Sequence, residues 1–156
     1  PRLGNGPIIV AVDTSGSMSG RAIEIAYSLL LQLLNLAKKQ KRKCFLISFA
    51  VRAQYLDLSL PSNRLRLDDF LTNKFTGGTN GEQMLNAALQ MLQTDNYSMA
   101  DVLIISDFFF PTPIRETRAK MNAEHNKGTR FYGLRIGLNN MGSSYDKVLD
   151  QNWVVN

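Results

Sequence analysis

Short apolar runs alternate with longer amphipathic segments along the chain. Residues 8–12 and 102–105 are unbroken apolar runs rich in β-branched side chains, a pattern typical of strands buried on both faces of a sheet. Further strands are expected at 43–49, at 53–58 on a sheet edge, at 130–136 and at 153–155. Apolar residues at helical spacing predict helices over 22–36, 82–92 and 114–124, with shorter helices near 64–71 and 145–149.

This alternation of strands and helices predicts the fold class. We expect a doubly wound α/β domain with a mainly parallel sheet, helices on both faces and one antiparallel edge strand, because successive strands must be joined by helical crossovers. No repeat or linker interrupts the pattern, so we predict a single domain over residues 1–156. The chain begins at Pro1 rather than at a methionine, and we expect it to be excised from a longer protein.

The composition excludes several kinds of protein. A chain of 156 residues hides roughly 70% of its unfolded surface, so its core needs no disulfide or structural metal. Cys44 is the single cysteine, which excludes an internal disulfide, a four-cysteine zinc site and an iron–sulfur cluster, and favours a reducing, cytoplasmic location. The longest apolar stretch, residues 29–36, is too short to span a membrane.

The net charge of +5 is concentrated in one segment, KKQKRK, which follows the first predicted helix. Such a run can bind nucleic-acid phosphates, but no aromatic side chains that could stack on bases are interleaved with it. Cations also stabilise the C-terminus of a helix. We interpret residues 38–43 as a solvated helix end and expect no nucleic acid, with a basic nucleic-acid-binding module as an alternative function.

Polar residues follow the strands at the points where a parallel sheet binds its ligands. Asp13, Ser15 and Ser17 come after the first strand, and Asp107 comes after the strand at 102–105. Thr79 lies in a glycine-containing loop between them in sequence. Ligands of open α/β sheets bind beyond the carboxyl ends of the strands, so these oxygens are expected to converge. Hard oxygen donors without histidine or cysteine match Mg²⁺, Mn²⁺ or Ca²⁺.

A cation held by this set would keep room for a further ligand. The two carboxylates balance the double positive charge of the ion, and the three hydroxyls add no charge. Mg²⁺ in such a site keeps some of its coordinated water molecules. We expect a carboxylate from a partner protein to displace a water and complete the coordination shell. Gly16, Gly77 and Gly78 are expected to let the backbone approach the ion closely.

At these residues the sequence resembles the von Willebrand factor type A (VWA) domains. The D-x-S-x-S element is present as Asp13, Ser15 and Ser17, with Thr79 and Asp107 at the remaining positions of the family's metal-ion-dependent adhesion site. The resemblance implies that the serines bind the metal directly, the threonine directly or through water, and the aspartates often through water. It implies a Rossmann-like fold and a metal-dependent interaction module rather than an enzyme.

Within that family, several segments are similar to the carboxy-terminal domain of ViaA-type bacterial proteins. They are GPIIVAVDTSGSM, CFLISF, the FTGGT loop, VLIISDF and the near-terminal Trp153. This resemblance implies a partner among the MoxR-class AAA+ ATPases, hexameric machines linked to metal insertion or complex remodelling.

Other interpretations of the same residues remain open. Asp13 and Ser17 could merely cap the following helix. Asp13 could also be the nucleophile of a metal-dependent phosphatase or related hydrolase, but the general acid expected two residues later is Ser15 instead. The sequence contains no P-loop. His125, the single histidine, lies in a polar segment and is expected at the surface, and Cys44 is expected to be a buried apolar residue.

Aromatic residues directly follow the second aspartate, in the segment Phe108-Phe109-Phe110-Pro111. Phe108 is expected to pack beneath the loop, as large apolar residues usually do. We hypothesise that Phe109 or Phe110 forms an apolar rim around the metal and anchors the partner, with Met18 as a weaker candidate for the same rim.

Overall fold

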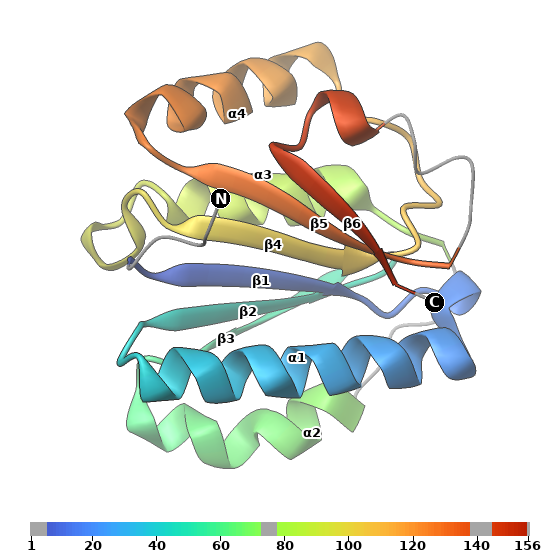
Figure 1. Cartoon of the computed structure of the whole chain (residues 1–156), viewed down its shortest axis with the longest axis vertical. Helices are drawn as coiled ribbons and strands as arrows, with labels where there is room; N and C mark the ends of the chain where they lie inside the picture. The colour runs from blue at the N-terminus through green and yellow to red at the C-terminus, as the bar shows by residue number, and fades with distance from the viewer. Residues whose placement is uncertain (1–5, 73–77, 138–144, 156) are drawn as a thin grey trace.

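The computed structural model describes residues 6–72, 78–137 and 145–155. In these ranges six strands form one sheet, in the spatial order β3-β2-β1-β4-β5-β6 (Figure 1). Neighbouring strands are parallel except β2 and β3, which are antiparallel. The strands are β1 (Ile8–Asp13), β2 (Cys44–Phe49), β3 (Ala53–Asp57), β4 (Asp101–Ser106), β5 (Arg130–Ile136) and β6 (Gln151–Val155).

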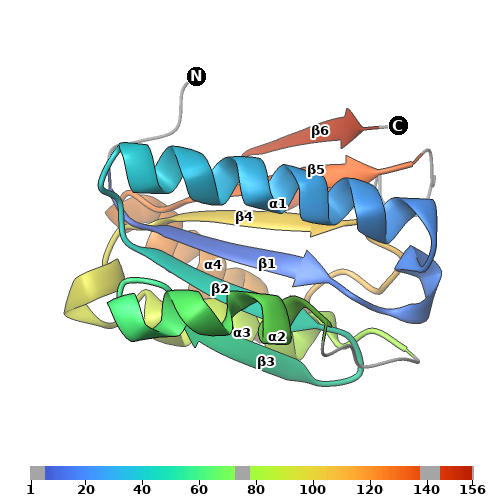
Figure 2. The same cartoon turned by 90° about the horizontal axis from the view of Figure 1, so that it is seen from below.

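Helices cover both faces of this sheet. Figure 2 shows α1 and α2 in front of the strands, with α3 and α4 behind them. The helices are α1 (Arg21–Lys39), α2 (Leu67–Thr72), α3 (Gly81–Met91) and α4 (Arg115–Lys127), and short 3-10 segments form η1 (Gly16–Met18), η2 (Pro61–Arg66) and η3 (Asp95–Tyr97). The doubly wound, mainly parallel sheet and its antiparallel edge strand β3 are therefore confirmed.

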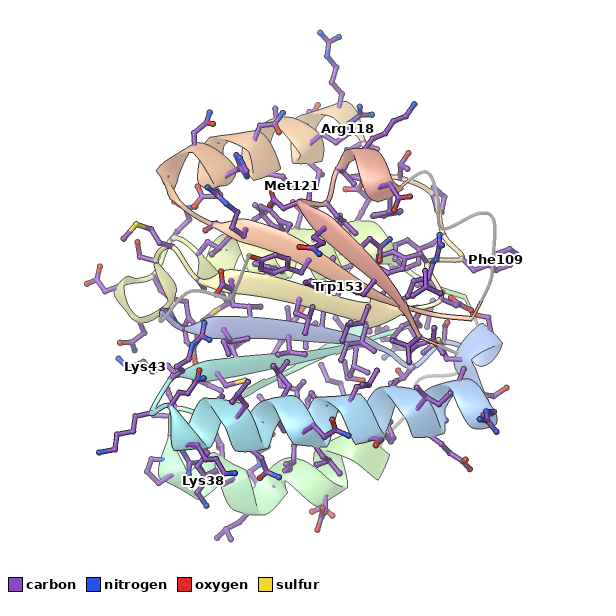
Figure 3. The ribbon with its side chains drawn as sticks, in the orientation of Figure 1. Lys38, Lys43, Phe109, Arg118, Met121 and Trp153 are labelled. Carbon is purple, nitrogen blue, oxygen red and sulfur yellow. The ribbon has the colours of Figure 1, made fainter. Side chains whose placement is uncertain are left out.

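The central strands are buried along their whole length because each face packs on a separate apolar core. Ile9 and Ala11 of β1 lie in the core beneath α3 and α4, whereas Val10 and Val12 lie in the core beneath α1 and α2. Met121 of α4 points toward the sheet and Arg118 of the same helix points into solvent (Figure 3). Burying an aliphatic side chain of this size contributes about 1.5–3 kcal/mol, so the central strands form a rigid support for the residues at their ends.

Element boundaries differ from the sequence-based expectations at several places. The short helix expected at 64–71 is divided into η2 and α2, because Pro61 begins a 3-10 turn first. Helix α4 continues through Lys127 and ends at Gly128, whose φ of 124° is accessible mainly to glycine. Strand β6 begins at Gln151, two residues before the expected strand, and residues 145–147 form a 3-10 turn.

The basic run is only partly the solvated helix end that we expected. Lys38 and Lys39 lie exposed in the last turn of α1. Arg42, in contrast, is buried, because its guanidinium donates to Asp101 at the start of β4 over 2.9 Å and to the carbonyl of Gly6. The expectation was wrong for Arg42, since its charge is used inside the protein to join the turn after α1 to β4.

Two further expectations concern burial. Cys44 is buried at the start of β2, and burial together with the nearby charge of Asp57 raises the pKa of its thiol to about 12. The thiol is therefore protonated at neutral pH and packs as a small apolar group, as expected. Among the described helices, none has both the length and the apolar character needed to cross a membrane.

Candidate metal centre

The carboxylate of Asp13 is held at the carboxyl ends of β1 and β4. Val12 pairs with Ile105, so the next residues along these strands, Asp13 and Ser106, lie side by side. The Ser106 hydroxyl donates to Asp13 Oδ2 over 2.6 Å, and the backbone N–H of Ser15 donates to Oδ1 over 2.8 Å. Both carboxylate oxygens are therefore fixed in position while each keeps acceptor capacity.

The electrostatic surroundings of Asp13 favour a nearby cation. Asp13 is fully buried, and this burial raises its pKa, although the hydrogen bonds from Ser106 and Ser15 act in the opposite direction. Asp107 directly follows Ser106, the residue that bonds Asp13, and its charge also raises the pKa of Asp13. A divalent cation between such groups stabilises their ionised forms.

The two serines of the D-x-S-x-S element lie together in the turn after β1. Ser15 Oγ and Ser17 Oγ are 3.2 Å apart, and Ser17 is exposed while Ser15 is buried. Gly16, between them, is exposed at the start of η1. Neither Asp13 nor Ser17 is the N-cap residue of α1, because that position is taken by Gly20, which makes no side-chain cap hydrogen bond. The capping interpretation is therefore wrong.

The loop that carries Thr79 is tied to the strand next to β1. The backbone N–H of Asn80 donates to the carbonyl of Ala50, directly after β2, over 2.6 Å. The Asn80 side chain then caps α3 by accepting from the N–H of Gln83. These bonds bring the partly exposed Thr79 to the ligand-binding edge of the sheet, with Gly78 beside it, whereas Gly77 lies outside the described residues.

Asp107 begins a tight turn in which consecutive phenylalanines take opposite directions. The N–H of Phe109 donates to Asp107 Oδ1 over 3.1 Å, and the N–H of Phe108 donates to Ser106 Oγ over 2.8 Å. Phe108 has a φ of 56°, in the left-handed region that non-glycine residues rarely adopt. This turn leaves Phe109 53% exposed, projecting beyond the carboxyl ends of the strands (Figure 3).

Two residues expected at the apolar rim lie in the cores instead. Phe110 is 5% exposed. Its ring packs edge-on against Phe49 and lies so close to Gly81 that a Cβ at that residue would clash with it. Met18 is fully buried in the core beneath α1 and α2. The rim assignments of Phe110 and Met18 were therefore wrong, and Phe109 is the one of the three that reaches solvent.

A groove of about 490 Å³ lies beside Thr79. Residues 78–82 form one wall, and Pro111, Thr112 and Ile114 form the other. Val51 and Ile114 are exposed apolar residues on its border, at 51% and 56%. The groove thus places apolar surface next to the cluster of oxygen donors.

The single histidine and the single cysteine lie away from the candidate site. His125 is at the end of α4, before β5 begins, and its ring nitrogen is 3.0 Å from Asp150. Its side chain is 42% exposed, which confirms the expected surface position. Cys44 lies at the start of β2, at the other end of the strand from the candidate site. In the described ranges, no group of three or more histidine, cysteine or acidic residues is placed to hold a metal.

Ser106 is the site residue that sequence reasoning missed. It directly precedes Asp107, is fully buried and bonds both Asp13 and the Phe108 amide. Its position as the last residue of an apolar strand was the available signal. Glu82 was also missed: its carboxylate accepts from the Ile114 amide and from Thr117 Oγ1, and so joins the starts of α3 and α4.

Comparison of the sequence with known families and proteins identifies its relatives. The sequence model of the von Willebrand factor type A domain matches residues 8–109. A regulatory protein ViaA from Edwardsiella ictaluri (strain 93-146) is 31% identical over 149 residues, which is 95% of this chain. The chain spans 31% of that relative's length.

Solved structures share the fold at low sequence identity. A conserved hypothetical protein BatB from Bacteroides thetaiotaomicron superposes with a TM-score of 0.70 at 18% identity, covering 96% of this chain and 90% of BatB. Proximal thread matrix protein 1 from the mussel byssus, solved with a zinc-occupied metal-ion-dependent adhesion site, gives a TM-score of 0.65 at 14% identity, covering 97% and 42%. The matched family model, the ViaA relative and the observed sheet agree, and this chain belongs to the von Willebrand factor type A domain family.

Proposed function

We propose that this domain binds a divalent cation, Mg²⁺ or Mn²⁺, and uses it to engage an acidic residue of a protein partner. The residues that would hold the cation are Asp13, Ser15, Ser17, Thr79 and Asp107. The bound ion would act as an electrophile that accepts a carboxylate from the partner. The role of the protein is then recognition, with no bond made or broken in either molecule.

The arrangement around Asp13 is the observation that carries this proposal. Its carboxylate is buried and fixed by the Ser15 amide and by Ser106, the residue directly before Asp107. Buried carboxylates are costly unless a cation or hydrogen bonds compensate them. All the candidate donors are oxygens, which favours Mg²⁺ or Mn²⁺ over softer ions, although the mussel relative was solved with zinc.

Phe109 and the groove beside Thr79 give the partner apolar contacts next to the ion. We propose that Phe109 packs against the partner residues that flank its carboxylate, since a desolvated aromatic anchor is typical of interface hot spots. Val51 and Ile114 on the border of the groove extend this apolar surface.

We extend the proposal to a wider setting on the basis of the similarity to ViaA. We infer that residues 1–156 form one interaction domain of a longer cytoplasmic protein, because the chain spans less than a third of its ViaA relative. The partner that we propose is a MoxR-class AAA+ ATPase, to which the domain would connect the rest of its chain as an adaptor.

Isothermal titration calorimetry with Mg²⁺ tests the metal site. We expect the wild-type chain to bind Mg²⁺ and Asp13→Asn to lose at least about tenfold in affinity, since a neutral amide removes one of two charges at the site. Asp95→Asn is the matched control, because Asp95 is exposed at the start of η3. Equal Mg²⁺ affinity in wild type and Asp13→Asn would refute the site.

The interaction itself is tested with the purified ATPase. Binding of a MoxR-class ATPase to the wild-type chain should require Mg²⁺, disappear in EDTA and weaken in Phe109→Ala. Turnover of p-nitrophenyl phosphate that depends on Mg²⁺ and on Asp13 would instead establish the hydrolase alternative. Binding that depends steeply on salt and not on metal would favour the basic surface at Lys38 and Lys43, which lies at the opposite end of the molecule from Phe109 (Figure 3).

A further inference from the structure

An arginine lies in the same row of the sheet as Asp13 and Ser106. Asp13 and Ser106 are the last residues of β1 and β4, and Ser106 pairs with Arg135, the next-to-last residue of β5. The three residues thus lie on adjacent strands in the order β1, β4, β5 (Figure 1). Side chains alternate between the faces of a strand with a period of two. All three residues therefore belong to the face beneath α3 and α4, where the residues two or four positions before them are buried: Ala11, Ile104 and Phe131.

The guanidinium group of Arg135 is incompletely paired. Its Nε and Nη1 atoms are buried, and neither has a hydrogen-bond partner in the part of the chain that the structure describes. The buried Arg42, in contrast, donates to Asp101 and to a backbone carbonyl. A buried donor left without an acceptor is destabilising, and a charged donor more so, so such a group indicates a partner that the described part of the chain does not supply.

The surroundings of Arg135 favour an anion as that partner. Gly133 lies two residues before Arg135 on the same face, next to the ring of Phe108. A Cβ added to Gly133 would be 3.0 Å from Phe108 Cζ. Phe108 packs in turn on Tyr145, with ring centroids 5.1 Å apart. Apolar rings lower the local dielectric constant and strengthen an ion pair formed there. Arg135 as a whole is only partly buried, so part of its side chain is open to solvent although Nε and Nη1 are not.

We propose that Arg135 binds a second carboxylate of the acidic partner, next to the carboxylate that completes the metal site. This inference rests on the proposed function for the presence of that partner. A guanidinium binds a carboxylate through two parallel hydrogen bonds, from Nη2 together with either Nε or Nη1, which would satisfy one of the two unpaired nitrogens. Arg135 and Asp13 are two strand spacings apart, about 10 Å between Cα atoms. An extended peptide spans that distance between residues i and i+3, so the partner motif has two acidic residues separated by two others.

The anion site can be tested on the 156-residue chain without any metal. The Nε–H signal of Arg135, identified by its loss in Arg135→Lys, is followed by NMR during titration with sodium acetate in EDTA. We expect a saturating shift that sodium chloride at equal ionic strength does not produce. The exposed Arg118 serves as the internal control and should move only slightly. An Arg135 signal that moves no more than the Arg118 signal would overturn the proposal, as would saturation by inorganic phosphate but not by acetate.

A second experiment tests the two carboxylates together. The blocked peptide Asp-Gly-Gly-Asp is titrated in Mg²⁺ against wild type, Arg135→Gln and Asp13→Asn. We expect Arg135→Gln to bind it about tenfold more weakly, as for the loss of a hydrogen bond to a charged group, and to bind a peptide with one aspartate as wild type does. Equal loss for both peptides, or none, would overturn the inference. Because Arg135→Gln should keep its Mg²⁺ affinity, a failure of the metal site would appear separately, as absence of Mg²⁺ binding to wild type.

Discussion

Ser106 gives the sharpest test of how the candidate site is built. Its hydroxyl donates to Asp13 and accepts from the Phe108 amide, and all three residues are fully buried. In Ser106→Ala, the carboxylate loses a donor and the amide loses its acceptor. The variant thus removes a hydrogen bond to a charged group and leaves a buried N–H without a partner.

The expected cost follows from these two losses. A hydrogen bond to a charged group contributes about 1.5–3 kcal/mol, and a buried donor without an acceptor costs about 1–3 kcal/mol. We therefore expect Ser106→Ala to lower the free energy of unfolding by about 3 kcal/mol, a large share of the stability of a typical domain. The pKa of Asp13 should also rise further, because the bond from Ser106 lowers it in the wild type. Mg²⁺ affinity should then fall, and fall more at pH 6 than at pH 7.5.

Urea unfolding in EDTA measures the first effect and calorimetric titration with Mg²⁺ measures the second. Ser48→Ala is the matched control, because Ser48 is a buried serine at the end of β2 whose hydroxyl is 3.4 Å from Thr14 Oγ1. Such a long contact should contribute at most about 1 kcal/mol. If Ser106→Ala destabilised the chain no more than Ser48→Ala does, the bond to Asp13 would not be holding the carboxylate and our account of the site would be wrong.

Two further substitutions test the site's electrostatics and packing. The folded-state pKa of Asp13 is raised above its value of 3.8 in the unfolded chain. The metal-free protein should therefore lose stability as the pH rises from 3.8 to the raised pKa of the folded state. Asp13→Asn should therefore be the more stable protein at neutral pH in EDTA, and the order should reverse in saturating Mg²⁺; unfolding curves that run parallel with pH would contradict this. Gly81→Ala should cost about 1–3 kcal/mol in urea unfolding, because its Cβ would stand 2.7 Å from Phe110 Cδ1. Gly78→Ala, with no atom within 4 Å of its Cβ, should be close to neutral, and equal stability of the two variants would show that Phe110 can move aside.

Much of the fold and several site positions could be predicted from the order of residues alone. The apolar runs ending at Asp13 and Asp107 have a local pattern that does not depend on the rest of the chain, because strands buried on both faces must be apolar throughout. Crossover connections then require those strands to run parallel, so their polar ends meet at one edge. The D-x-S-x-S element and its place at that edge followed from these two facts, whereas metal binding itself stays a prediction.

Other features depended on contacts between residues far apart in the sequence. Phe109 and Phe110 have the same chemistry. The left-handed backbone at Phe108 directs Phe109 outward, and the missing Cβ of Gly81 leaves room for the ring of Phe110 inside. The burial of Arg42 required Asp101, 59 residues later in the chain. Side-chain direction and ion pairing are decided by what lies opposite in space, and residue order along one segment contains no information about that neighbour. The row of Asp13, Ser106 and Arg135 became visible for the same reason, once the register of three strands was known.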